Sequence, residues 1–284
     1  MNDLNIDKLH ILFSKIPDFF FRIEEGCNTE KRGGVFGCLE NDIEIKADRD
    51  LATFIHKFWS ENLRDFCSIQ IEGLGVDGDI SKDYRLAVDP LDGSLNYKLR
   101  GRSFGLPMTT CMTLLKRQEK LTRFSDIVFA GVMDLRHPTD FWRVKMTETG
   151  KYKTYFRGIP AKTMQVDNLD IRSQILIAEM YYPSNREKIC QAFANEKGWL
   201  RNPGSAAYEM ALVASGQAVA FICDQQKQHE LGAAYALVKG AGGVVVDWEG
   251  KDLGDQEYLF NAQTSVVVAA NQTIAYQILK RLNL

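Results

Sequence analysis

The chain has 284 residues, 45% of them hydrophobic and 25% charged, a composition typical of a globular protein with one large domain or two fused lobes. Its 35 basic and 37 acidic residues leave a formal charge of −2, without the basic excess that binding to nucleic-acid phosphates requires. No apolar run approaches the roughly 18 residues of a membrane span, and residues 1–10 do not resemble a signal peptide. The six cysteines show no CxxC spacing, so we expect reduced thiols and a cytoplasmic protein.

The first half of the chain predicts two helices followed by strands. Apolar residues at helical spacing indicate a first helix that stops at Pro17 and a second that follows Asp48. The glycine-rich segment 29–37 is expected to form a loop. Strands are predicted where β-branched and apolar residues gather, over 68–72, 84–88, 107–115 and 127–133. This half is therefore expected to be α+β.

Beyond residue 155 strands and helices alternate, which is typical of an α/β arrangement. Strands are predicted over 175–178, 218–222, 244–247 and 266–270, and helices over 205–215, 230–239 and up to Leu282. No repeat or linker separates the halves. We expect residues 1–284 to form one unit with lobes at about 1–155 and 156–284.

A G-x-G-x-x-G pattern at residues 73–78 follows a predicted strand. A dinucleotide site also needs a helix that begins there and holds the pyrophosphate. The next residues, Asp-Ile-Ser-Lys-Asp, have no helical period, and another strand begins by Tyr84. We interpret the segment as a turn.

The segment Asp-Pro-Leu-Asp-Gly-Ser, residues 89–94, directly follows the apolar run 86–88. Asp89 and Asp92, with the Leu91 carbonyl between them, form a corner of oxygen ligands that suits Mg²⁺. Backbone N–H groups at Gly93 and Ser94 would begin a helix and favour a bound phosphate. The alternative is that Asp89 caps a turn and Asp92 caps a helix; the hexapeptide alone leaves both open.

Glu72 ends the preceding predicted strand and offers a third carboxylate. It reaches Asp89 only if strands 68–72 and 84–88 run parallel or the chain bends. A connection of eleven residues is at the short limit for a parallel crossover, which usually takes about a dozen.

These motifs resemble the inositol monophosphatase family, which belongs to the magnesium-dependent, lithium-sensitive superfamily that includes fructose-1,6-bisphosphatase. VDPLDGSLNY (88–97) resembles the family's D-P-[I/L]-D-G-[T/S] signature, and HELGAAYALVKGAGG (229–243) resembles its second signature. Further similar segments are IKADRD (45–50), GSAAYEMALVASG (204–216) and the final VVVAANQTIAYQIL. The resemblance implies a layered α-β-α-β-α fold and a homodimer.

The resemblance also implies a metal centre with two or three Mg²⁺ ions. Glu72, Asp89 and the Leu91 carbonyl would hold one ion, and Asp89, Asp92 and Glu230 a second. A weaker third ion would lie on Glu72. Such ions neutralise the charge of a phosphate ester and activate a water molecule.

Other roles follow from the same resemblance. Gly93 and Ser94 would bind phosphate, and Asp48 with the Ser94 hydroxyl would orient the attacking water. The implied catalytic residues are therefore Glu72, Asp48 and Ser94. The implied substrate-binding residues are Asp92, Ser205, Ala206 and Cys223.

Three positions depart from the family pattern. Glu230 replaces an aspartate, and His229 replaces a tryptophan. We interpret His229 as a packing or orienting residue rather than a metal ligand. Cys223 stands where inositol monophosphatases carry a glutamate that binds inositol. The neighbouring Asp224 should point the other way along a strand.

The substrate therefore stays open. A small phosphate ester is expected, first myo-inositol-1-phosphate, with fructose-1,6-bisphosphate, a 3′-phosphoadenosine nucleotide and histidinol phosphate as alternatives. A binding module without turnover is a further hypothesis, but such a module should lack a metal-binding carboxylate. All four, Glu72, Asp89, Asp92 and Glu230, are present.

Overall fold

Two β-sheets organise the computed structural model, which describes residues 3–29, 46–100, 105–147, 149–181 and 183–284. The first sheet has the strand order β2 (Gly75–Asp77), β1 (Cys67–Ile71), β3 (Tyr84–Asp92), β4 (Thr109–Lys116), β5 (Ile127–Asp134), β6 (Phe141–Met146), β7 (Tyr152–Phe156) and β8 (Ile159–Pro160). The second has the order β10 (Trp199–Arg201), β9 (Ile175–Ala178), β11 (Ala220–Lys227), β13 (Gln263–Ala269) and β12 (Val244–Asp247).

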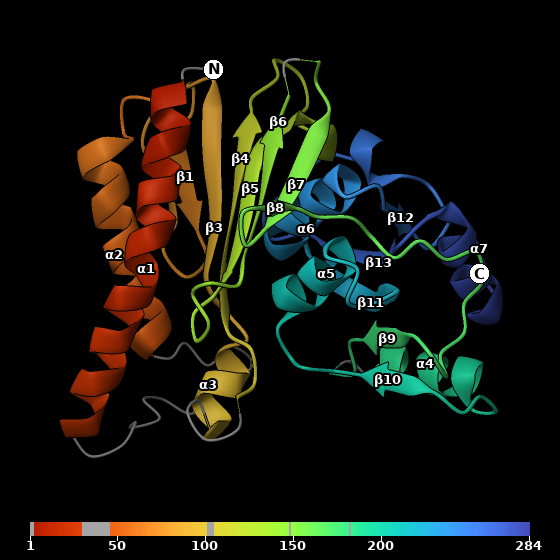
Figure 1. Ribbon diagram of the computed structural model, residues 1–284. Helices are drawn as coiled ribbons and strands as arrows, with labels where there is room; N and C mark the ends of the chain where they lie inside the picture. The colour runs from red at the N-terminus through yellow and green to blue at the C-terminus, as the bar shows by residue number, and fades with distance from the viewer. Residues whose placement is uncertain (1–2, 30–45, 101–104, 148, 182) are drawn as a thin grey trace.

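The helices lie in three layers around these sheets (Figure 1). Helices α1 (Asp3–Thr29) and α2 (Lys46–Asn62) cover the outer face of the first sheet, while α5 (Ala206–Ala214) and α6 (Gln228–Gly240) lie between the sheets. Helices α4 (Pro183–Phe193) and α7 (Gln272–Arg281) lie against the second sheet, and the short α3 (Ser94–Arg100) follows β3. The α-β-α-β-α arrangement expected from the resemblance is confirmed.

Each interface between layers has its own hydrophobic core. One core joins α1 and α2 to the first sheet, a second surrounds α5 and α6, and a third joins the second sheet to α4 and α7. Central strands are therefore covered on both faces, and every residue of β5 is buried. This explains why their sequences are continuous apolar runs rather than alternating ones.

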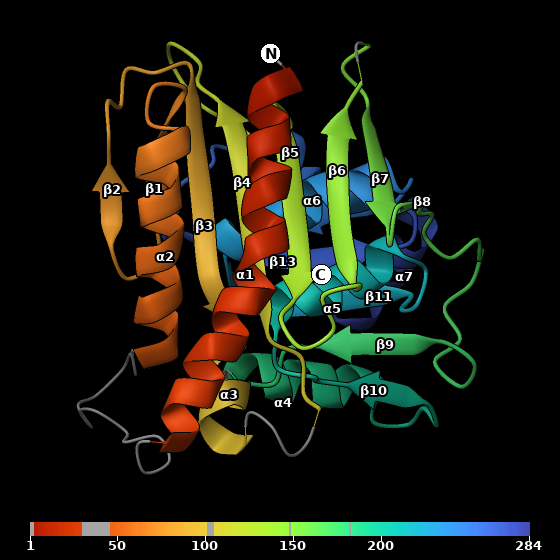
Figure 2. The ribbon, with the colours of Figure 1, turned by 60° about the vertical axis from the view of Figure 1, so that its left-hand side comes forward.

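The pairing of β1 with β3 explains how Glu72 comes close to Asp89. These strands run parallel, with Ile71 opposite Val88, so Glu72 and Asp89 lie at the same level along the two strands. The short β2 turns back antiparallel on the other edge of β1, as Figure 2 shows. A small extended segment, instead of a helix, makes this crossover, which is why eleven residues suffice.

The same segment confirms that the G-x-G-x-x-G pattern is not a dinucleotide site. Gly73, Gly75 and Gly78 have positive φ values of 79°, 88° and 85°, which favour glycine at the turns around β2. The chain continues into β3, and no helix begins there.

The prediction for the first helix was wrong at its end. Helix α1 continues through Pro17 to Thr29, and residues 30–37 of the predicted loop lie outside the described part. Burial continues across the proline, because Phe13, Ile16 and Phe20 are almost fully buried. This packing outweighs the cost of about 3 kcal/mol that an interior proline imposes on a helix.

Other boundaries were closer, although several elements were missed. Strands 175–178 and 244–247 are confirmed, whereas β3 runs four residues further than predicted and ends at Asp92. The unpredicted elements include β6 and β7, which lie toward one edge of the first sheet, and helix α4.

Within the described residues, no helix is long and apolar enough to span a membrane. The four cysteines with described side chains, Cys67, Cys111, Cys190 and Cys223, are free thiols.

Helix α6 is packed closely enough to test. A Cβ atom at Gly232 would lie 2.7 Å from the Tyr258 ring and 3.2 Å from the Thr113 hydroxyl. Gly232→Val should lower the free energy of unfolding by about 2 kcal/mol or more, because both neighbours are buried. Urea denaturation measures this change in the free energy of unfolding. Lys239→Ala on the same helix loses only a partly exposed ion pair with Asp252 and should change stability by less than about 1 kcal/mol. Equal stability of the two variants would contradict this packing.

Candidate metal centre and active site

Four carboxylates from three segments converge where β1 and β3 end and α6 begins. Asp89, Asp92 and Glu230 form one group whose potential ligand atoms all lie within 4.8 Å of one another. Glu72, Asp89 and His229 form a second such group. Asp89 belongs to both, so the arrangement has the form of two adjacent cation sites with a shared carboxylate. Asp89 and Asp92 are only 1% and 7% exposed.

The buried charges oppose one another. Burial, followed by repulsion from Glu72, Asp92 and Glu230, raises the pKa of Asp89 well above its usual range. Burial also raises the pKa of Glu230, with further contributions from Asp92 and Glu72. Three or four carboxylates this close repel one another when ionised, and a divalent cation bound among them would offset that repulsion. The donor set fits a hard cation because it consists mainly of carboxylate oxygens.

Hydrogen bonds hold Asp92 in a fixed position. Its Oδ2 accepts from the Ser205 hydroxyl at 2.7 Å, the Ala207 N–H at 2.7 Å and the Thr109 hydroxyl at 3.2 Å. The Ala206 N–H donates to Oδ1 at 3.2 Å. Burial nevertheless outweighs these bonds and raises the pKa of Asp92. The first turn of α5 thus orients this carboxylate.

Hydrogen bonds also hold the loop before α5 against the segment 88–97. The Asn96 amide donates to the carbonyls of Pro107, Pro203 and Gly204 at 2.8, 2.9 and 3.1 Å. Gly93 has φ 84°, and a Cβ there would lie 2.9 Å from the Pro107 carbonyl. Only glycine fits this position, which brings the loop against Asp92.

Ser205 and Ala206, predicted to bind substrate, both contact Asp92 in the structure. Ser205 is 1% exposed. Ala206 also lines a pocket beside the carboxylates, together with Cys223, Lys227 and Glu179. Cys223 contributes a buried thiol whose pKa is raised by burial.

Asp224 points away from this pocket. Its Oδ1 accepts a hydrogen bond from the Ser265 hydroxyl on β13 at 2.6 Å. Glu179, which follows β9, does line the pocket, together with Asp92 and Glu230 of the acidic cluster. Sequence analysis missed Glu179 because nothing near it resembles a functional motif.

Two further residues near Glu72 were not predicted as part of the site. The Lys227 ammonium lies 2.8 Å from Glu72 Oε1, and His229 Nε2 lies 3.4 Å from Glu72 Oε2. Burial opposes ionisation of Glu72, but its contacts with His229 and Lys227 outweigh burial and lower its pKa to about 2. Glu230 in turn accepts a hydrogen bond from Gln226.

Of the remaining predicted residues, Asp48 is half-buried in α2 and close enough to Asp89 to raise the pKa of that carboxyl. Leu91 is buried, and its N–H donates to Asp89 Oδ1 at 2.9 Å. Gly93 and Ser94 are partly exposed at the start of α3. The structure thus brings Asp48, Glu72, the 89–94 segment and Glu230 to one place.

Residues 21–283 match the model of the inositol monophosphatase family. This chain belongs to that family. Its members are metal-dependent phosphatases. Both segments of this chain that resemble the family signatures, residues 88–97 and 229–243, lie within the matched range.

Individual relatives are distant. A protein of Aquifex aeolicus named fructose-1,6-bisphosphatase/inositol-1-monophosphatase is 24% identical over 225 residues, which cover 74% of this chain and 77% of the relative. An inositol-1-monophosphatase of Mesorhizobium japonicum is 24% identical over 239 residues, 84% of this chain and 82% of the relative. The structure of extragenic suppressor protein suhB from Bartonella henselae has a TM-score of 0.76 at 20% identity, and the alignment covers 98% of this chain and 97% of that one.

Cation binding by this family member should be visible as a thermal shift. Mg²⁺ or Mn²⁺ added to protein stripped with EDTA should raise the melting temperature, because an ion at 1,000 times its Kd stabilises the folded state by about 4 kcal/mol. Asp89→Asn should abolish most of this shift, since Asp89 belongs to both groups. Differential scanning fluorimetry measures both.

The matched control is Asp170→Asn, which removes a partly exposed carboxylate paired with Arg172. It should keep the full cation-dependent shift. A shift of the same size in Asp89→Asn would show that the ions bind elsewhere.

Proposed function

We propose that this protein hydrolyses a small phosphate monoester with the help of divalent cations, and that myo-inositol-1-phosphate is its first candidate substrate. The observation that carries the proposal is the pair of acidic groups sharing Asp89 in a member of a phosphatase family. Two adjacent cation sites are the usual arrangement for clamping the attacking and leaving oxygens of a phosphate ester.

The proposed ligands are Glu72, Asp89, the Leu91 carbonyl, Asp92 and Glu230. Bound ions, Mg²⁺ by family resemblance and two or three in number, would offset the negative charge of the ester and lower the pKa of water. The protein's own contribution is to position these ligands before the substrate arrives, which the hydrogen bonds to Asp92 support.

Phosphate binding and water activation are assigned to neighbouring residues. Gly93 and Ser94, partly exposed beside Asp92, would receive the phosphate. Asp48 and the Ser94 hydroxyl would orient the attacking water, a role supported by the electrostatic proximity of Asp48 to Asp89. With Glu72 they form the proposed catalytic set. No covalent intermediate is needed, because phosphoryl transfer depends mainly on positioning and charge.

The substrate's alcohol would lie in the pocket lined by Tyr181, Ala206 and Cys223. Since a thiol accepts hydrogen bonds only weakly, we propose that Glu179, which lines the same pocket, contacts sugar or polyol hydroxyls in its place. The Aquifex relative carries both enzyme names, so fructose-1,6-bisphosphate is the second candidate. From the resemblance to the inositol monophosphatase family we also propose that Li⁺ inhibits the protein and that it forms a homodimer. We further propose a cytoplasmic location and a single catalytic unit with lobes at 1–155 and 156–284.

Phosphate release tests the proposal. With Mg²⁺ or Mn²⁺ the protein should release phosphate from at least one of four esters: myo-inositol-1-phosphate, fructose-1,6-bisphosphate, a 3′-phosphoadenosine nucleotide and histidinol phosphate. EDTA should abolish release, and millimolar Li⁺ should reduce it. Asp92→Asn should lower kcat by about 100-fold or more, because it removes a charge at the reacting centre, while circular dichroism stays unchanged.

Asp170→Asn serves as the control and should retain wild-type turnover. An Asp92→Asn enzyme with full activity removes Asp92 from the metal centre. Metal binding without turnover of any ester would support the alternative of a binding module.

A further inference from the structure

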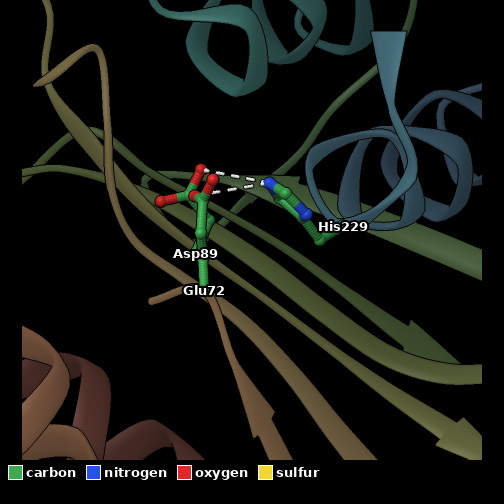
Figure 3. A group of neighbouring side chains, drawn as sticks. All are labelled: Glu72, Asp89 and His229. Atoms are coloured by element: carbon green, nitrogen blue, oxygen red, sulfur yellow. Dashed lines mark ion pairs between the residues drawn. The ribbon is translucent and has the colours of Figure 1, made fainter. Parts of the chain in front are cut away.

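The ring of His229 faces the acidic cluster rather than only the core. It lies in the first turn of α6, is 1% exposed, and packs on the Phe260 ring with centroids 4.8 Å apart. Its Nε2 atom lies 3.4 Å from Glu72 Oε2, 4.0 Å from Asp89 Oδ2 and 3.8 Å from Glu230 Oε1. Figure 3 shows the ring directed at Glu72 and Asp89. The interpretation of His229 as a packing or orienting residue agrees with its contact with Phe260. It did not predict that Nε2 would face the carboxylates.

The other ring nitrogen fixes the tautomer. His229 Nδ1 lies 3.1 Å from the Phe260 carbonyl oxygen, and a carbonyl only accepts hydrogen bonds, so Nδ1 carries a proton. In the neutral ring Nε2 then presents a lone pair. Metal-binding histidines commonly donate their second N–H to a backbone carbonyl in this way.

Nε2 is buried and has no hydrogen-bond partner among the described residues. In the neutral ring this lone pair would be repelled by the carboxylate oxygens, so the close approach requires a positive charge between them, which a bound cation would supply. The distances of 3.4 to 4.0 Å exceed the range of about 2.7–3.2 Å for a well-formed N–H···O hydrogen bond. They suit donors that share one six-coordinate ion, because ligands about 2.1 Å from such an ion are about 3.0 Å apart at a right angle and about 4.2 Å apart on opposite sides.

Lys227 supports the same geometry. Its ammonium contacts Glu72 Oε1 at 2.8 Å, which leaves Oε2 directed at His229. The lysine thus orients Glu72 to offer one oxygen, beside the histidine nitrogen and Asp89 Oδ2.

We propose that His229 Nε2 is a metal ligand and that, with Glu72 and Asp89, it forms a nitrogen- and oxygen-donor site for a first-row transition ion such as Mn²⁺. An imidazole ligand favours such ions over Mg²⁺, which prefers oxygen alone. The group of Asp89, Asp92 and Glu230 stays an all-oxygen site suited to Mg²⁺. The proposal rests on the metal centre of the proposed function but is independent of its substrate.

Pulsed electron paramagnetic resonance of the Mn²⁺-loaded full-length protein tests this directly. The wild type should show the nitrogen coupling of a directly bound imidazole. His229→Phe, which keeps the ring packing, should lose the coupling. In calorimetric titrations with Mn²⁺ and Mg²⁺, this variant should lose about tenfold or more of the wild type's preference for Mn²⁺.

His56→Gln is the matched control, because His56 also faces a carboxylate, Asp77 at 2.7 Å, outside both metal groups. It should retain the coupling and the preference. If His229→Phe does not fold, the wild-type spectrum and His229→Gln decide the question.

Mn²⁺ bound by the wild type without nitrogen coupling overturns the proposal and shows His229 as a neighbour of Glu72 only. The same holds if Mn²⁺ does not bind. Phosphate release with Mg²⁺ would leave the proposed function standing in either case. Conversely, nitrogen coupling in a protein that hydrolyses none of the four esters would support the site and contradict the phosphatase proposal.

Discussion

Repulsion among buried carboxylates is the constraint on which this structure depends. Asp89 lies at the centre of the cluster, at 1% exposure, and each neighbouring carboxylate makes its ionised form less favourable. Removing such charges from water costs several kcal/mol per group unless a counter-charge is present. Four carboxylates held together in this way form a site that could bind cations, and bound cations would compensate for the cost of holding the site open.

The rest of the architecture positions these charges. Parallel pairing of β1 and β3 brings Glu72 and Asp89 to one level, and the turn at Gly93 presents Asp92 to the first turn of α5. Helix α6, buried between the two sheets, places His229 and Glu230 opposite β3. Because these side chains come from elements that pack into hydrophobic cores, the fold sets their relative positions, and such prior positioning is what efficient catalysis requires.

The acidic residues of the site could be predicted from the sequence, but the residues that contact and orient them could not. Asp89 and Asp92 were identifiable because a proline and a glycine at fixed spacing constrain the backbone around them, and Glu230 because its helix resembles a family signature. The orientation of His229 depends on the Phe260 carbonyl, 31 residues away, and on Glu72, so no local pattern could reveal it. The role of Ser205 toward Asp92 joins residues 113 positions apart and was similarly out of reach.

The fold shows the same division between local and tertiary effects. Strands covered on both faces, such as β5, were found from their apolar runs. Strand β6 was missed because Arg143 and Lys145 interrupt its apolar pattern, although the alternating residues Trp142 and Val144 are buried. Pro17 misled the prediction for α1 because burial of the residues around it outweighs its local cost.

The most direct test of the central claim is an anomalous-scattering experiment on crystals of the protein soaked in Mn²⁺. The account predicts two anomalous peaks in the cluster, both in contact with the Asp89 carboxylate, one beside Glu72 and the other between Asp92 and Glu230. Peaks confined to surface sites, or the absence of any peak next to Asp89, would contradict it.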